Sequence, residues 1–155
     1  MIFVVDTREQ KPYWFALSQF KTALIAGDYT TLKLLNKVHI ERKSPEDWYG
    51  TIIGGHARFR REILRARDHH IKLIMVIESS RKAFVNKEFP RGDQRKIKTE
   101  TLDRICATIE ARYKLEFHWC ADRDKAKKKV FNLLKKHEKE SKEKNGRRSR
   151  RRRTT

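Results

Sequence analysis

Cysteine is scarce in this chain of 155 residues, which contains only Cys106 and Cys120. Two thiols cannot build a disulfide framework or a four-ligand zinc site, so a small secreted scaffold and a zinc finger are both excluded. No apolar run approaches the ~20 residues that a membrane-spanning helix needs. No basic residue precedes the apolar run that opens the chain, so we do not expect a signal peptide. These absences predict an intracellular protein without a membrane partner, in the cytoplasm or nucleoid, or in the nucleus of a eukaryote.

Acidic residues are also few: 20 Asp and Glu stand against 39 Lys and Arg, which gives a formal net charge of +19. Hydrophobic residues make up 37% of the chain, which is low for a globular domain but too high for a disordered one. Residues 121–155 carry +11 of the charge. We therefore predict a folded domain over residues 1–121, a basic helix over residues 122–145 and a disordered arginine-rich tail over residues 146–155. The charge predicts a polyanionic partner.

Strand-like and helix-like segments alternate along the first 120 residues. Short β-branched or apolar runs predict strands, and apolar residues at helical spacing predict helices. Ser44 followed by Pro45 is a typical helix start. The expected strands cover residues 2–5, 29–35, 38–42, 72–78 and 115–119, and the expected helices cover residues 45–53, 59–66, 102–113 and a segment from 122 onward, with residues 7–26 and 86–96 irregular. This order predicts an α/β fold with a mixed central sheet flanked by helices.

Acidic residues occupy the points where predicted strands begin or end. Asp6 and Glu9 follow the first strand, Asp28 precedes the second, and Glu41 lies near the end of the third. Carboxylates at neighbouring strand ends can converge, and their oxygens suit Mg²⁺ or Mn²⁺. Alternation along the strand puts Glu41 and Lys43 on one face. A metal site beside an ammonium group is suited to phosphodiester hydrolysis.

The acidic residues alone leave a second interpretation open. They can be solvated strand ends, with Glu41 paired to a nearby arginine, because Asp followed by Glu-x-Lys is a common pattern. In that case the acids would have no catalytic role.

Three motifs in this chain resemble those of the XPF-type structure-specific endonuclease family, in the family's order. GD at residues 27–28, followed after twelve residues by ERKSPED at residues 41–47, resembles the signature GD…ERKxxxD. VVDTRE at residues 4–9 is similar to the opening D-x-R-E motif, and ARFRREIL at residues 57–64 resembles the G-R-F/Y-x-x-Q helix. The match covers roughly residues 2–120. It implies a restriction-endonuclease-like fold and a divalent-metal-dependent endonuclease, a hydrolase of DNA repair and recombination.

Roles for individual residues follow from the same resemblance. It implies that Asp28 and Glu41 bind Mg²⁺ or Mn²⁺ together with the backbone carbonyl of Arg42, and that Lys43 is the catalytic lysine. Asp6 and Glu9 would support or join this catalytic site. The substrate would be branched, flapped or nicked DNA. The residues expected to contact DNA or orient the acids are Arg8, Arg42, Arg58 and Arg61.

The chain departs from the family pattern in two respects. Glu62 stands where the family commonly has Gln, a difference expected to lie outside the metal site. XPF-type proteins usually append a tandem helix-hairpin-helix domain, whereas this chain is expected to be a stand-alone nuclease domain. The arginine tail could replace that domain in binding DNA, or could serve as a nuclear import signal. Its arginines are Arg147, Arg148, Arg150, Arg151, Arg152 and Arg153.

Two other functions compete with an endonuclease. A non-catalytic DNA-binding or partner subunit of a nuclease complex is the first, because such families include degenerate members; such a subunit would be expected to have lost Asp28, Glu41 or Lys43. A basic packaging protein is the second, and it would leave the ordered acidic motifs unexplained. A domain of this size covers little DNA, so we also expect a homodimer.

Overall fold

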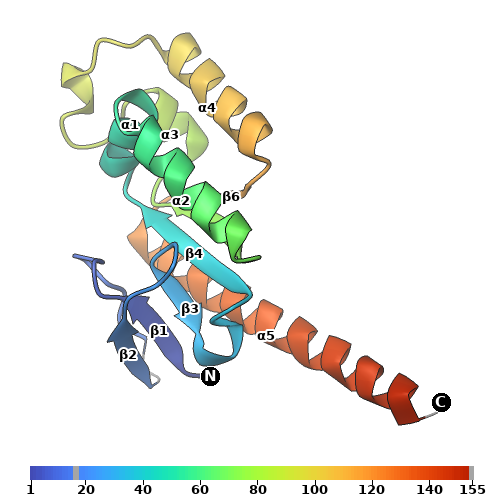
Figure 1. The fold of residues 1–155 in the computed structure, drawn as a ribbon. Helices are drawn as coiled ribbons and strands as arrows, with labels where there is room; N and C mark the ends of the chain where they lie inside the picture. Colours follow the sequence, from blue (N-terminus) through green and yellow to red (C-terminus); the bar gives the residue numbers. More distant parts are fainter. Residues whose placement is uncertain (16–17, 154–155) are drawn as a thin grey trace.

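A computed structural model describes residues 1–15 and 18–153. Figure 1 shows a central sheet with helices on both faces and a long final helix that leaves the body of the molecule. The strands are β1 (Phe3–Asp6), β2 (Gln19–Thr22), β3 (Tyr29–Thr31), β4 (Val38–Lys43), β5 (Lys72–Ile77) and β6 (Glu116–Trp119). The helices are α1 (Pro45–Ile53), α2 (His56–Asp68), α3 (Arg81–Val85), α4 (Thr99–Tyr113) and α5 (Arg123–Arg153), with short 3₁₀ turns η1 (Leu32–Leu34) and η2 (Gly92–Gln94).

The six strands form one mixed sheet in the order β2-β1-β3-β4-β5-β6. β3 pairs antiparallel with β1 and β4, and the other described pairings are parallel. The C-terminal ends of β1, β4 and β5 and the N-terminal end of β3 therefore lie side by side at one end of the strands, which we call the site edge of the sheet. The fold confirms the predicted mixed α/β architecture, including the hairpin of β3 and β4.

Both faces of the sheet are buried at its centre. Leu73, Met75 and Ile77 of β5 join the core formed with α1, α2, α3 and α4, whereas Ile74 and Val76 join the core formed with α5. This two-sided burial explains why β5 is an unbroken apolar run in the sequence. Ser44 caps α1 as predicted, with its hydroxyl accepting a hydrogen bond from the Asp47 N–H at 3.1 Å.

Three segments differ from the expectations. Residues 7–26 contain the edge strand β2, whose half-exposed side chains give no strong apolar pattern. The helix α3 follows β5, where no helix was expected; the Ser80 hydroxyl caps it by accepting from the Ala83 N–H. The predicted disorder of residues 146–155 is wrong over the described part, since α5 continues to Arg153. Arginine and lysine are good helix formers, and Gly146 lowers helix stability by only ~1 kcal/mol.

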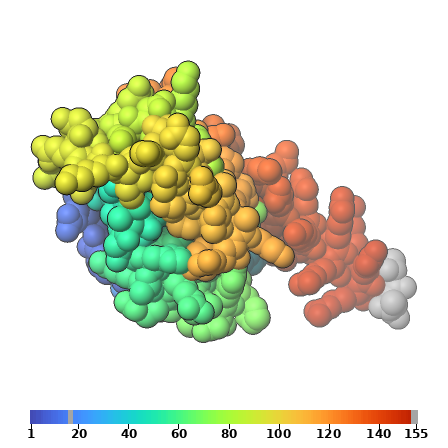
Figure 2. Space-filling model, turned by 90° about the horizontal axis from the view of Figure 1, so that it is seen from above, coloured from blue at the N-terminus to red at the C-terminus, as the bar shows by residue number. Residues whose placement is uncertain are grey.

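The first half of α5 is part of the core. Ala126, Val130 and Leu134 are fully buried against the sheet and Leu133 is nearly so, as their spacing predicts. Residues 142–152 are all exposed. Seen from above, this distal half stands clear of the body (Figure 2). Within the described chain, no helix is both long and apolar enough to cross a membrane.

Replacing Leu134 with Ala should lower the free energy of unfolding by ~2–5 kcal/mol, because a fully buried leucine leaves a cavity between α5 and the sheet. Urea denaturation followed by circular dichroism measures this change. Lys135→Ala, at the exposed neighbouring position, should change the same free energy by no more than ~0.5 kcal/mol. Equal small effects of both substitutions would show that α5 contributes nothing to the core.

Candidate active site

The acidic residues of the predicted site gather at the site edge of the sheet. Asp6 ends β1, Glu41 and Lys43 lie at the end of β4, and Asp28 directly precedes β3. Because β3 runs against its neighbours, its N-terminal end lies beside the C-terminal ends of β1 and β4. Strand direction alone therefore brings residues from distant parts of the sequence to one place.

The pleat of β4 sends alternate side chains to opposite faces of the sheet. Glu41 and Lys43 point to the face that α1 and α2 cover, and the Lys43 Nζ lies 2.7 Å from the Glu41 Oε1. Arg42 points to the face that α5 covers. The structure confirms that Glu41 and Lys43 lie on one face of the strand.

Asp28 is held beside Glu41 by the turn that Gly27 makes. Gly27 has φ +71°, and a Cβ there would lie 3.0 Å from the Ile40 carbonyl oxygen. The Asp28 N–H donates to that same carbonyl at 2.8 Å, and the Asp28 Oδ2 accepts from the Arg42 N–H at 2.8 Å. The Gly-Asp pair is therefore needed because only glycine fits the turn that fixes the carboxylate.

The backbone carbonyl of Arg42 points toward the Asp28 side of β4. The carbonyls of Lys37 and Lys43 accept from N–H groups on the β5 side, and carbonyl direction alternates along a strand. The Arg42 carbonyl therefore points to the opposite side of β4, away from β5. The Ile40 carbonyl points the same way and accepts from the Asp28 N–H. The Asp28 and Glu41 side chains line one cavity, and the Arg42 carbonyl points to the side of β4 on which Asp28 lies.

Burial and mutual repulsion make this pair of carboxylates hard to ionise. Burial, followed by the charge of Glu9, raises the pKa of Asp28 to about 7. Burial and the nearby Asp28 charge raise the pKa of Glu41 well above its ordinary value. Burial opposes the charged form of Lys43, but Glu41 outweighs it and raises the pKa of the lysine. The ammonium group of Lys43 therefore balances only one of the two negative charges that Asp28 and Glu41 carry when both are ionised.

This donor set fits a divalent metal with hard-oxygen preference. Two carboxylates and a backbone carbonyl are ligand types that Mg²⁺ and Mn²⁺ take, with water completing the shell. The described residues include no cluster of three or more His, Cys, Asp or Glu suited to a metal. Two carboxylates and one carbonyl are therefore the oxygen donors that Asp28, Glu41 and Arg42 would offer to a divalent metal.

Arg42 holds two carboxylates on the opposite face of β4. Its Nε and Nη2 each lie 2.8 Å from a different oxygen of Glu9, and its Nη1 lies 2.5 Å from the Glu78 Oε1. The side chains of all three residues are less than 10% exposed. The guanidinium of Arg42 is thus buried and orients Glu9 and Glu78. Arg42 and Glu9 also line another cavity, which they share with Asp28, Glu41 and Lys43.

Glu78 is a site residue that the sequence interpretation missed. It accepts from the Tyr13 hydroxyl at 2.8 Å and from Arg123 at 3.2 Å, in addition to Arg42. Its position as the last residue of the predicted strand 72–78 was the available signal, because that strand lies next to β4 in the sheet. Burial opposes ionisation of Glu9, but the Arg42 hydrogen bonds keep the pKa of Glu9 low.

Asp6 also has a structural set of partners. Its Oδ1 accepts from the Arg8 N–H and Nε, both at 2.8 Å, and its Oδ2 accepts from the Leu24 N–H at 2.7 Å. Burial opposes the charged form, but the Arg8 hydrogen bonds outweigh it and lower the pKa of Asp6. Asp6 therefore fixes the loop after β1 beside the site. Arg8 remains 63% exposed and faces the cleft.

Glu62 of α2 lies at the site, although the sequence interpretation placed it outside. Its Oε1 accepts from the Gly27 N–H at 2.9 Å, and its side chain lines the same cavity as Asp28 and Glu41. Its charge contributes to the raised pKa of both. The only sequence signal was its occurrence in place of Gln, so its role depends on the approach of α2 to the site edge of the sheet.

Arginines form one wall of this cavity, which has a volume of about 770 Å³. Arg58, Arg61 and Arg65 occupy one face of α2 at spacings of three and four residues, and all three are exposed. Arg58 and Arg61 were expected here; Arg65 was missed because no motif marks it. The arginines of the tail do not belong to this site, because they lie at the far end of α5 (Figure 1).

Replacing Asp28 with Asn should raise the melting temperature of the metal-free protein by a few degrees at pH 8. The unfolded carboxyl releases its proton near pH 4, whereas the folded one keeps it to about pH 7. The folded state thus binds more protons between these values, and wild-type stability falls as the pH rises through them. Differential scanning fluorimetry from pH 4 to 8 measures this; the gain should vanish near pH 4. A variant that melts below wild type at pH 8 would contradict the repulsion.

Comparisons with known proteins agree with this fold. A family model described as the ERCC4 domain matches residues 5–133. Among solved structures, XPF from Aeropyrum pernix is 17% identical with a TM-score of 0.64, covering 86% of this chain and 63% of that chain. The structure of XPF from Aeropyrum pernix in complex with DNA gives the same identity and TM-score, with 88% and 64% covered. Among curated protein sequences, none matches.

The two kinds of comparison carry different weight. The structural likeness confirms the predicted nuclease-domain fold, and this chain spans less than two thirds of the length of either XPF structure. The family match spans most of the chain, including every residue of the Asp28, Glu41 and Lys43 site. The chain therefore belongs to the ERCC4-domain family, a family of nucleases that act on DNA.

Proposed function

We propose that this protein is a divalent-metal-dependent endonuclease that hydrolyses phosphodiester bonds in branched, flapped or nicked DNA. The observation that carries the proposal is the convergence of Asp28, Glu41 and Lys43 in a cavity walled by arginines. A carboxylate pair next to a cationic wall combines a metal site with a surface for a polyanion. Location inside the cell and assembly as a homodimer remain part of the proposal.

Different residues of the site would have different roles in the reaction. Asp28, Glu41 and the Arg42 carbonyl would hold Mg²⁺ or Mn²⁺, which when bound activates water and polarises the phosphate. Lys43, kept protonated by Glu41, offsets negative charge that develops on the phosphate oxygens. Arg42 holds Glu9 and Glu78 on the opposite face of β4, which keeps this strand end in place.

The DNA would follow the arginine wall. Helical neighbours three or four residues apart lie ~5–6 Å from one another, which suits consecutive phosphates of one strand. Arg58, Arg61 and Arg65 form such a row, and Arg8 continues it on the other side of the acids. Phosphate contacts of this kind position a duplex without reading its sequence.

A non-catalytic DNA-binding subunit is the second candidate. It would share the basic cleft but would not need the buried carboxylate pair. Since unpaired buried carboxylates reduce stability, a subunit without catalysis would gain by losing one of them. The retention of Asp28, Glu41 and Lys43 in one cavity favours the endonuclease.

Incubation of labelled flap, fork, nicked and four-way DNA with Mg²⁺ or Mn²⁺ tests the proposal. We expect cleavage of at least one branched or nicked substrate and none in EDTA. Asp28→Asn should abolish cleavage while DNA binding persists. Binding without cleavage of any substrate would favour the non-catalytic subunit, and cleavage in EDTA would contradict the metal assignment.

Lys43→Ala should reduce the cleavage rate by ~10²–10³-fold, as the loss of one transition-state stabilising group does, with a smaller effect on DNA affinity. Single-turnover cleavage and anisotropy binding separate the two quantities. Lys33→Ala removes one exposed lysine far from the acids and serves as the charge-matched control. If both variants cut at the wild-type rate, Lys43 has no catalytic role.

Arg61→Ala should weaken DNA binding and reduce the slope of log affinity against log salt by about 0.9, the value for one lost phosphate contact to duplex DNA. Arg60→Ala removes the same charge from the same helix at an exposed position that does not line the cavity. We expect no comparable change in slope for this control. Identical salt slopes for both variants would exclude a specific contact by the arginine row.

A further inference from the structure

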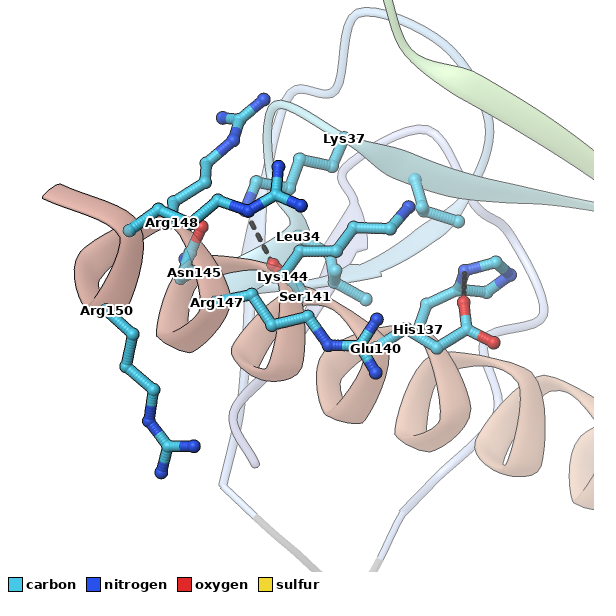
Figure 3. A pocket seen from close by; sticks show the side chains of 12 residues that line it. Leu34, Lys37, His137, Glu140, Ser141, Lys144, Asn145, Arg147, Arg148 and Arg150 are labelled. Atoms are coloured by element: carbon cyan, nitrogen blue, oxygen red, sulfur yellow. Dashed lines mark hydrogen bonds and ion pairs between the residues drawn. The ribbon is translucent and has the colours of Figure 1, made fainter. Parts of the chain in front are cut away.

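A second large cavity lies at the opposite end of the sheet from the acidic residues. It is a groove of about 1000 Å³ between the distal half of α5 and the segment that connects β3 to β4 (Figure 3). Leu34, Lys37 and Val38 line one side, and side chains of α5 between residues 137 and 151 line the other. We call it the distal groove. None of its lining residues lines the cavity of the active site.

The charge of the distal groove is strongly positive. Lys37 contributes from the strand connection, and Lys144, Arg147 and Arg148 contribute from α5 (Figure 3). Glu140 is the acid in the lining, and its carboxylate lies 3.5 Å from the His137 ring at the inner end. Beyond Ser141 the α5 side of the groove carries no acid in its lining: Asn145 is neutral, and the other side chains there are the cations Lys144, Arg147, Arg148, Arg150 and Arg151.

The groove has a fixed position relative to the active site. Buried residues of α5 anchor the helix to the sheet, and the Lys37 Nζ donates to the Ser141 Oγ at 2.6 Å across the groove. At its other end α5 begins with Arg123, which contacts Glu78 at the active site. One continuous helix thus connects the two cationic surfaces, whereas a disordered tail would leave the second surface without a defined place.

We infer that the distal groove binds the phosphate backbone of a second duplex arm of a branched DNA whose first arm occupies the active-site cleft. This inference rests on the proposed action on branched DNA. The cleft lies beside α2 and the groove lies beside α5, and these two helices cover opposite faces of the sheet. The groove can therefore bind a duplex arm whose axis differs from that of the first arm. The protein would then recognise a branch by occupying two arms at a fixed separation.

The separation follows from helix geometry. Arg123 lines a cavity together with Asp28, Glu41 and Lys43, and it is 18 residues from Ser141 at the groove, which at 1.5 Å per residue is ~27 Å. At 3.4 Å per base pair this distance corresponds to ~8 base pairs of duplex. With the branch point in the active-site cleft, a second arm much shorter than this cannot reach the groove, so the contribution of the groove should appear only above this arm length.

Charge reversal of Lys144 and Arg147 tests the inference. Binding of Lys144→Glu/Arg147→Glu is measured in EDTA by anisotropy on a fork with 20-base-pair arms, on the same fork with 5-base-pair arms, and on a linear duplex. We expect about a tenfold loss of affinity for the long-armed fork and less than about a threefold loss for the other two DNAs. Arg104→Glu/Arg112→Glu, on the exposed face of α4, is the control with equal charge change and should show no such preference.

The neutral variant Lys144→Gln/Arg147→Gln, checked for helix content by circular dichroism, guards against unfolding of the distal helix and should show the same preference in weaker form. Equal losses for all three DNAs in both groove variants would overturn the inference, as would losses no larger than those of the control. Because these measurements need no cleavage, failure of the endonuclease proposal would appear separately, as uncut DNA in Mg²⁺ together with an intact preference for the long-armed fork.

Discussion

The alternation of side chains along β4 is the constraint on which the site depends. Glu41 and Lys43 face α2 and form the reactive side with Asp28, while Arg42 faces α5 and binds Glu9 and Glu78. A shift of one residue in the pairing of β4 with β5 would exchange the two sets. The parallel register from Val38 to Lys43 is therefore a requirement for the proposed site as well as for packing.

The two faces of β4 differ in how far their buried charges are balanced. The Arg42 face is internally neutralised, because the guanidinium groups of Arg42 and Arg123 together balance the charges of Glu9 and Glu78. The Glu41 face is not: burial raises the pKa of Asp28 and Glu41 with only Lys43 adjacent. Such a deficit reduces the stability of the metal-free protein, and a divalent cation would remove it. The hydrogen-bonded Arg42 face fixes the end of β4 and thereby positions Glu41 and Lys43 on the other face.

Sequence reasoning was most successful where local patterns decide the outcome. Strand alternation placed Glu41 with Lys43, and the capping preference of serine placed the start of α1. It failed where tertiary contacts decide: Glu62 reaches Gly27 only because α2 crosses the end of the sheet, and the contact of Arg42 with Glu78 depends on the pairing of β4 with β5. The tail was expected to be disordered for lack of apolar residues, but its helix propensity and the anchored first half of α5 extend the helix instead.

Titration of the metal-free protein with Mn²⁺ by calorimetry, in the absence of DNA, tests whether Asp28 and Glu41 bind a metal. We expect about one bound ion for wild type and an affinity at least about tenfold weaker for Glu41→Gln. Glu88→Gln, at an exposed position remote from the cavity, should bind as wild type does. Equal Mn²⁺ affinity for wild type and Glu41→Gln would contradict the assignment of this carboxylate pair as the metal site.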